Sequence, residues 1–432
     1  MTDTWLKNTT PDSITGIIFA FEGIKNAVTL LNGPTGCKFY HAAVSENQGK
    51  RAVEFELPFF PEQWYFEQPR VPCTYLDKRD YVYGSEDKLR EAIEFISKNS
   101  SPELIAVVNS PGAALIGDDL ERIVNSASPD CPVVTVESSG YSQQMKDGYT
   151  TAAVKLIGSL CEKREKRHEA ENKRINLIGL SIFHKYYEGS IRELRRLFKL
   201  CGIEVNCVLF AGSTVEEIKR LPEAALNVVI DPVFGRETAE YLKIEFGMPY
   251  INTKSLPLGF AETEKMLRAT ADFLKADVGG AIKDAEIKRA DCFIALQSVN
   301  NLTGLPKGTK FAVHGTSSEC LGYCRFLTSY LGMVADVVSL TDNDPETKNL
   351  LSDFLTERGA EGALLKDIDE TEADIVFADG NTIGRLRSKG HIFSGVETSM
   401  PGMGYIDIVP KTHLGNKGAC LIVEQVLNGL IY

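Results

Sequence analysis

The chain has 432 residues, of which 43% are hydrophobic and 25% charged, so it can form two or three hydrophobic cores. Its formal net charge of −12 argues against a nucleic acid as partner, because nucleic-acid binding draws much of its affinity from clustered lysine and arginine. The sequence contains neither an apolar run long enough to cross a membrane nor a signal peptide at residues 1–5, so we expect a cytoplasmic protein with no membrane or nucleic-acid partner.

Short β-branched runs alternate with amphipathic helical stretches along the chain. Such alternation predicts βαβ units built on parallel sheets. A unit that begins at Ile175 has a counterpart that begins at Phe311, which indicates a repeated architecture. The predicted strands are residues 104–108, 133–136, 175–180, 205–210, 228–230, 311–314 and 375–378.

The alternation breaks at two places. A charged helix predicted at about 163–173 precedes a new strand, and residues 288–310 separate two helical stretches. We therefore predict an α/β protein with three Rossmann-like domains, each a parallel sheet flanked by helices. The predicted domains are residues 1–165, 174–287 and 288–432.

Ligands of open α/β sheets gather at the carboxyl ends of the strands. His184, His314 and Lys254 each end or follow a predicted strand, and an imidazole there could act as a proton donor near neutral pH. A structural, hydrogen-bonded histidine is the alternative interpretation. The other loops at strand ends begin at Asp231 and Asp379, and no GxxxxGK[ST] or GxGxxG follows any strand, so the chain is not expected to hydrolyse ATP itself.

Two cysteines lie in loops rather than in periodic segments. Cys37 directly follows a Gly/Pro turn, and Cys73 follows Pro72. Thiolates favour iron–sulfur clusters or zinc, but zinc needs four ligands and no CxxC pair is nearby. If both thiols ligate in a homodimer, the two copies together supply four thiolates. The remaining cysteines that we considered are expected to be core residues: Cys201, Cys207, Cys292, Cys320, Cys324 and Cys420.

Several motifs in order and at specific spacing resemble the nitrogenase component 1 family over nearly the whole chain. The resemblance is closest to the β-type subunit of the molybdenum–iron protein and to related nitrogenase-like proteins. It is carried by residues 23–26, 32–37, 80–84, 115–119, 222–227, 246–250 and 413–419.

The resemblance implies an iron–sulfur cluster at a subunit interface, of the 4Fe-4S type or similar to the nitrogenase P-cluster. The family's first domain donates three cysteines, and only Cys37 matches one of them plainly; Asp12 and Pro111 stand at the other two positions. One subunit type of the protochlorophyllide enzymes uses a carboxylate ligand, so Asp12 is a candidate ligand, with a helix-capping role as the open alternative. Cys73 lies outside the family positions and is a candidate from its chemistry alone.

The family's larger cofactor is held by a cysteine and a histidine, where this chain has Asp231 and Leu414. His413 is one residue away, so we do not expect an iron–molybdenum cofactor. The resemblance implies an oxidoreductase subunit that takes electrons from an ATP-dependent iron–sulfur reductase and pairs with a homologous or identical subunit, as a homodimer or an α2β2 assembly. A non-catalytic scaffold for metallocluster assembly and a metal-free binding module are the alternatives.

Overall fold

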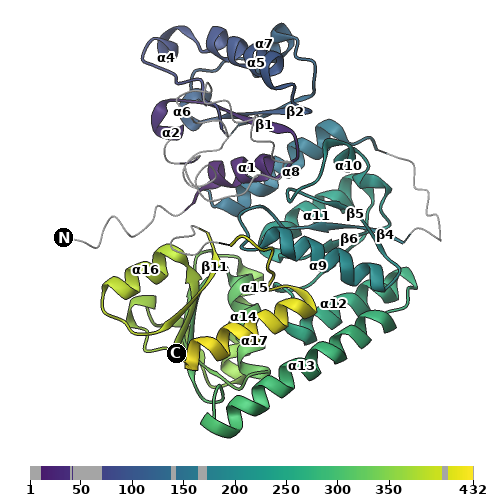
Figure 1. Ribbon diagram of the computed structural model, residues 1–432. Helices are drawn as coiled ribbons and strands as arrows, with labels where there is room; N and C mark the ends of the chain where they lie inside the picture. Colours follow the sequence, from purple (N-terminus) through teal and green to yellow (C-terminus); the bar gives the residue numbers. More distant parts are fainter. Residues whose placement is uncertain are drawn as a thin grey trace.

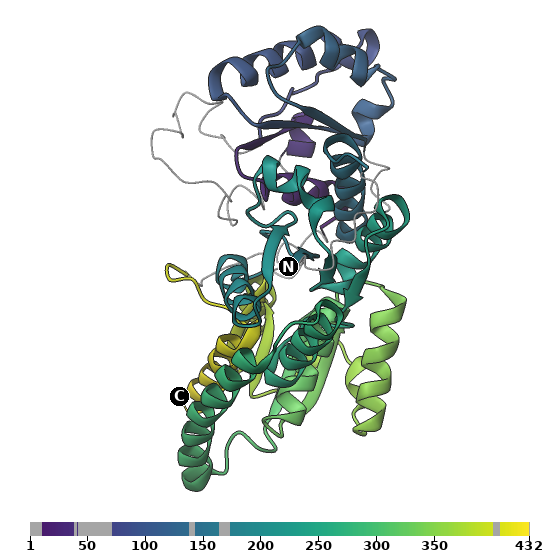
Figure 2. The ribbon, with the colours of Figure 1, turned by 90° about the vertical axis from the view of Figure 1, so that its right-hand side faces the viewer.

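The computed structural model describes residues 11–38, 41, 71–137, 143–163, 173–400 and 407–431. Three parallel sheets, each flanked by helices, follow one another along the chain (Figure 1). The first sheet lies at one end of an elongated molecule and the other two lie toward the opposite end (Figure 2). The predicted α/β class with three parallel sheets is therefore confirmed. No helix in the described ranges has the length and apolar character needed to cross a membrane.

The first sheet has the order β1-β2-β3 and alternates its side chains between two layers of helices. Leu31, Ala106 and Val108 face the core shared with α1 and α8, whereas Leu30 and Val107 face α5 and α7. The strands are β1 (Ala27–Asn32), β2 (Leu104–Asn109) and β3 (Val133–Glu137), and the helices are α1 (Ser13–Glu22), α2 (Thr35–Cys37), α4 (Asp80–Tyr83), α5 (Glu86–Ser100), α6 (Pro111–Ala114), α7 (Leu120–Ala127) and α8 (Met145–Leu160).

The second sheet has the order β5-β4-β6-β7. Its strands are β4 (Arg174–Ile178), β5 (Glu204–Val208), β6 (Leu226–Val229) and β7 (Tyr250–Asn252), and its helices are α9 (Tyr187–Leu200), α10 (Val215–Lys219), the 3-10 helix η4 (Leu221–Glu223), α11 (Pro232–Phe246), α12 (Gly259–Leu274) and α13 (Gly279–Thr303).

The third sheet has the order β11-β10-β8-β9, which places its first strand between its second and third strands, as in the second sheet. The repeated architecture predicted from residues Ile175 and Phe311 is thus present. The elements are β8 (Lys310–Gly315), α14 (Ser317–Ser329), β9 (Val334–Leu340), α15 (Pro345–Glu357), η5 (Glu361–Leu364), η6 (Ile368–Glu370), β10 (Ile375–Asp379), α16 (Gly380–Ser388), β11 (Ser394–Ser399) and α17 (Gly415–Ile431).

All seven predicted strands are present, and four more appear: β1, β7, β9 and β11. Each sheet lies within one of the predicted domain ranges. Helix α13, however, runs without a break across residues 287 and 288, so the exact boundary there stays a prediction. Most of the charged helix predicted at about 163–173 lies outside the described residues.

Helices α1 and α8 of the first unit are in close contact with each other, and α8 also packs against α11 of the second. A Cβ atom added to Gly16 would collide with the backbone of Met145, and one added to Gly148 would collide with the backbone of Ser13. The two helix backbones therefore touch only because these positions are glycine. On α8 the fully buried Tyr149 accepts a hydrogen bond from Gly179 N at 3.1 Å, just beyond β4.

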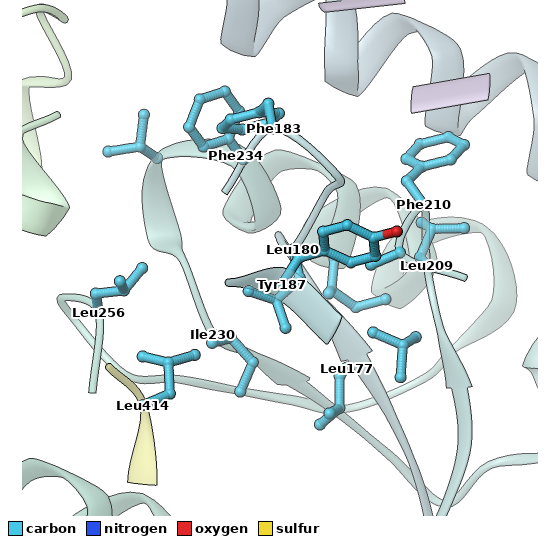
Figure 3. Close-up of a cluster of buried hydrophobic side chains, with 14 of the residues drawn as sticks. Leu177, Leu180, Phe183, Tyr187, Leu209, Phe210, Ile230, Phe234, Leu256 and Leu414 are labelled. Atoms are coloured by element: carbon cyan, nitrogen blue, oxygen red, sulfur yellow. The ribbon is translucent and has the colours of Figure 1, made fainter. Parts of the chain in front are cut away.

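The largest hydrophobic core continues from this contact to the carboxyl ends of β4 and β6. Leu177 and Ile230 lie beneath Phe183, in the loop after β4, and Phe234, in the first turn of α11; the two rings pack against each other with centroids 4.5 Å apart (Figure 3). Leu414, which precedes α17, reaches the same core (Figure 3). The loops at these strand ends therefore rest on a rigid apolar base.

Candidate functional site

Cys37 and Cys73 are brought to the same end of the first sheet. After β1, Gly33 turns the chain into α2, whose last residue is Cys37. The segment around Cys73 runs beside β1, where Leu31 N donates to Pro72 O at 2.9 Å and Thr74 N donates to Leu31 O at 3.1 Å. A Cβ placed on Gly33 would lie 3.5 Å from the Cβ of Cys37, and Cys73 Sγ donates to Gly33 O at 3.2 Å. Both thiols are buried.

The Cys73 thiol is held in its neutral form by its surroundings. Burial raises its pKa to about 11, although a hydrogen bond from Tyr75 N and the charge of Lys38 act in the opposite direction. A metal cation bound to the sulfur would favour the thiolate, because only the deprotonated thiol ligates a metal. Cys73 is thus a candidate soft-metal ligand but not a reactive free thiol.

Asp12 is connected to Cys37 through His41. The carboxylate caps α1, where Thr15 N donates to Asp12 Oδ1 at 3.1 Å, and the same oxygen lies 3.1 Å from His41 Nδ1. Burial opposes both charges, but the bonds between them lower the pKa of Asp12 and raise that of His41 to about 9, and His41 also bonds with Cys37. The capping interpretation of Asp12 is therefore correct, and a ligand role remains a proposal.

His41 is the residue of this site that sequence reasoning missed. Its available signal was the i,i+4 spacing from Cys37, which places two side chains on one face of a helical turn. That signal is weak, and the contact with Asp12 depends on the packing of α1.

Four exposed apolar residues lie on α4 and at the end of α6, and we define them as the exposed apolar surface: Tyr81, Val82, Tyr83 and Leu115. Tyr81 lies closest to the cysteines: burial raises its pKa, and the charges of Cys37 and Cys73 add to that rise. Pro111, at the third family position, begins α6 beside this surface.

The donor set within one chain is incomplete. In the described ranges, no group of three or more histidine, cysteine, aspartate or glutamate side chains is arranged to hold a metal ion. One chain offers two adjacent thiols, with Asp12 and His41 beside them. This sulfur chemistry fits an iron–sulfur cluster only if a second subunit supplies the remaining ligands.

A second set of polar residues lies where the strand order reverses in the second sheet, between β4 and β6. His184 Nδ1 accepts a hydrogen bond from Ser181 N at 3.1 Å, so its proton lies on Nε2, which donates to Asp231 Oδ2 at 3.1 Å. The ring stacks on Phe183 with centroids 4.2 Å apart. Phe234 covers its edge.

The third sheet repeats this arrangement between β8 and β10. His314 Nδ1 lies 2.9 Å from Ser339 Oγ, and His314 Nε2 lies 3.8 Å from Asp379 Oδ2. Burial lowers the pKa of His314. Asp379 caps α16 just as Asp231 caps α11. The second and third sheets thus each carry a histidine–aspartate pair at the position where open α/β sheets bind ligands.

Glu319 of α14 brings the third sheet toward the first of these pairs. Burial raises its pKa to about 7, while the charge of His184 lowers it and that of Asp231 raises it. His184 also forms an isolated bridge with Ser399 at the end of β11. The carboxyl ends of the second and third sheets therefore face each other. No hydrogen bond joins His184 to His314 in the part of the chain that the structure describes.

Other predicted positions lie apart from these clusters. Lys254 is half-exposed and pairs with Glu346 at 2.8 Å. Leu414 is buried in the core, and His413 uses both ring nitrogens, toward Tyr323 Oη at 2.6 Å and Gln425 Oε1 at 2.7 Å. Burial lowers the pKa of His413 to about 4, so its ring is neutral and fully engaged.

The remaining cysteines are packed as predicted, with one addition. Cys201, Cys207, Cys320 and Cys324 are buried core residues. Cys292 is buried as well, but its Sγ lies only 3.5 Å from that of the half-buried Cys420, a pairing that the sequence pattern did not indicate.

Three parallel sheets, with two buried thiols at the end of the first, form a series of three α/β units. The family model "Nitrogenase component 1 type Oxidoreductase" matches residues 13–430, so the chain belongs to the nitrogenase component 1 family, as its motifs indicated.

Curated relatives share about a quarter of their residues with this chain. A subunit of the light-independent protochlorophyllide reductase of Chaetosphaeridium globosum is 26% identical over 337 residues, which are 74% of this chain and 62% of that protein. The corresponding subunit from Staurastrum punctulatum is 28% identical with the same coverage. The chain thus spans about three fifths of the length of these relatives.

The solved structure "Nitrogenase Cp1 at pH 6.5" matches with a TM-score of 0.79 and 19% sequence identity. The match covers 98% of this chain and 93% of that one. It establishes a shared fold across all three sheets.

Proposed function

We propose that this chain is the iron–sulfur-cluster-binding subunit of a nitrogenase-like reductase, with Cys37 and Cys73 as thiolate ligands and Asp12 as a candidate third ligand. The observation that carries the proposal is the convergence of the two buried thiols at the end of β1 in a member of this family. A bound cluster would supply one-electron transfer, and the chain's own residues would exclude water from its sulfur ligands.

The cluster site calls for a partner subunit, homologous or identical, because one chain provides only part of a ligand set. The exposed apolar surface of Tyr81, Val82, Tyr83 and Leu115, in which Tyr81 lies closest to the thiols, supports an interface there, as a homodimer or an α2β2 assembly. Electrons would come from an ATP-dependent iron–sulfur reductase, since the chain has no phosphate-binding GxxxxGK[ST] loop of its own.

The facing carboxyl ends of the second and third sheets are the proposed substrate side of the protein. There the Nε2 proton of His184 would be delivered in a reduction once a substrate displaces Asp231 from that nitrogen, and His314 with Asp379 would play the same part from the third sheet. The names of the curated relatives make a tetrapyrrole the first substrate class to test; a dinitrogen-like molecule and a small sulfur or carbon compound are the others.

Iron and acid-labile sulfide, quantified together with electron paramagnetic resonance after anaerobic purification, test the cluster. Wild type should contain both, and Cys37→Ala should lose most of its iron because alanine offers no replacement ligand. Cys131→Ala is the matched control, since Cys131 lies in the same domain at the start of β3. Iron equal to wild type in Cys37→Ala would refute the assignment.

Light scattering of the iron-loaded protein tests the assembly. Only a monomer in that state would contradict a cluster shared between subunits. Transfer of the cluster to an apo-acceptor protein, without substrate turnover, would instead identify the chain as an assembly scaffold.

A further inference from the structure

Two cysteines meet at the contact between the long helix α13 and helix α17. Cys292 Sγ donates to Cys420 Sγ across 3.5 Å, although the residues are 128 positions apart in the sequence. Cys292 is buried, whereas Cys420 is half-buried and thus within reach of small molecules in solution. Neither residue belongs to the proposed cluster site.

The contacts around the two sulfurs fix the alignment of these helices. One turn before Cys420, Asn416 Nδ2 donates to Asp284 Oδ2 on α13 at 2.9 Å. Next to it, Lys417 N donates to Glu193 Oε1 on α9 at 3.1 Å. The first bond joins α17 to α13 and the second joins α17 to α9, so α17 is held in a position where the two thiols face each other.

The distance between the sulfurs is close to what a covalent bond requires. A disulfide has an S–S length of about 2.04 Å, so the two sulfurs need to approach by about 1.5 Å. The thiols also differ in character. The hydrogen bond from Cys292 lowers the pKa of Cys420 against the effect of burial, and Lys288 contributes in the same direction. The same bond, with burial, raises the pKa of Cys292.

We propose that Cys292 and Cys420 are a redox-active dithiol, which a small disulfide such as oxidised glutathione converts to an intrachain disulfide between α13 and α17. This site is independent of the proposed reductase function, because it requires neither a cluster nor a second subunit.

The reaction is a pair of thiol–disulfide exchanges in which Cys420 attacks first. Its thiolate bonds to one sulfur of oxidised glutathione, breaks the S–S bond and releases one glutathione thiolate. Cys292 then loses its proton and attacks the Cys420 sulfur of the mixed disulfide, releasing the second glutathione thiolate. Two electrons pass from the cysteines to the oxidant, and the two released thiolates take up the two cysteine protons.

The test is peptide mapping of the full chain, purified anaerobically and equilibrated with defined ratios of reduced and oxidised glutathione. Free thiols are trapped by acid quenching and alkylation. In wild type we expect a linked peptide pair that contains Cys292 and Cys420, with a mass lower by two hydrogen atoms than the two reduced peptides. Cys320 and Cys324, which are fully buried on α14 and lie i,i+4, are the internal control and should stay thiols.

Single serine variants separate the two roles. Cys292→Ser should accumulate a glutathione adduct on Cys420, because no second thiol can displace it, whereas Cys420→Ser should leave Cys292 as a thiol. Circular dichroism tests whether each variant is folded. If one is not, the wild-type peptide map still shows whether the disulfide between Cys292 and Cys420 forms. Two alkylated thiols in wild type at ratios that oxidise the unfolded chain would overturn the proposal. A mixed disulfide at Cys420 that never resolves in wild type would do the same.

Discussion

His184 Nε2 lies 3.1 Å from Oδ2 of the fully buried Asp231, while its Nδ1 is occupied by a backbone N–H. The backbone N–H of Ser181 at Nδ1 fixes the tautomer, and Asp231 accepts the hydrogen bond from Nε2. In the third sheet, His314 lies within β8 rather than in the loop after the strand, and its Nε2 is 3.8 Å from Asp379 Oδ2. Of the two histidines, His184 is thus the one whose ring is held more firmly.

Replacing His184 with glutamine should slow substrate reduction without removing iron. A lost general acid costs roughly 10²- to 10⁴-fold in turnover, and the cluster site lies in a different part of the chain. Turnover is measured with the reductase partner, and iron is measured on the same sample. His391→Gln is the matched control, because His391 lies at the opposite end of the third sheet and contacts Thr371 O. Equal turnover in both variants would assign His184 a structural role.

Cys73→Ala should lower the iron content at least in part. Burial raises the pKa of the Cys73 thiol and keeps it uncharged. Cys73 can therefore bind iron only if the metal displaces the thiol proton. Iron quantitation and electron paramagnetic resonance compare the variant with wild type and Cys131→Ala. An unchanged spectrum with full iron would make Cys73 a core residue that only donates to Gly33 O.

The Asp12 variants separate ligation from capping. Asp12→Cys should keep iron and shift the reduction potential if the carboxylate ligates, because ligand identity controls the potential of a cluster. Asp12→Asn should still accept the bond from Thr15 N, at a cost of no more than about 1 kcal/mol for the cap. Potentiometric titration of wild type, Asp12→Cys and Asp12→Asn decides between ligation and capping. Coinciding potentials with full iron would restrict Asp12 to the cap and its bond with His41.

Glu319 should make folding stability depend on pH. Its pKa is raised from 4.5 to about 7 by burial, so the folded chain holds this proton more tightly than the unfolded chain. Its contribution to stability is complete below about pH 4.5 and is lost as the pH rises through 7, a difference of about 3 kcal/mol. Denaturant unfolding at pH 5 and pH 8 should show this loss in wild type but not in Glu319→Gln.

The exposed Glu357 provides the control for that measurement. Glu357→Gln should follow wild type at both pH values. If the stabilities of wild type and Glu319→Gln differ by the same amount at pH 5 and pH 8, Glu319 does not titrate in this range.

The strands that the sequence pattern missed share one position, the edge of a sheet. β1, β7, β9 and β11 are all edge strands, whereas every central strand was predicted. A central parallel strand is buried on both faces and forms a continuous apolar run. An edge strand need not do so: β11 consists of Ser-Gly-Val-Glu-Thr-Ser, and β7 has only three residues.

The candidate sites were predictable only as far as local patterns extend. The rule for strand ends led to the loops at His184, Asp231, His314 and Asp379, and loop position singled out Cys37 and Cys73. The contacts of Asp12 with His41 and of Cys292 with Cys420 depend on how separate helices pack, so no local pattern encodes them. The exact pairing within each site therefore required the tertiary structure.

Helix α17 has a consequence for the order in which the protein can mature during synthesis. It packs on α9 of the second sheet and on β10 and β11 of the third, and its Lys417 N–H is the partner of Glu193. A ribosome that has completed the second sheet has not yet made α17, so Glu193, although paired with Arg196, lacks its bond from Lys417 N, and the part of α9 that contacts α17 stays uncovered until residues 415–431 emerge. The second Rossmann-like unit is thus completed only after α17, which follows the strands of the third, has been made.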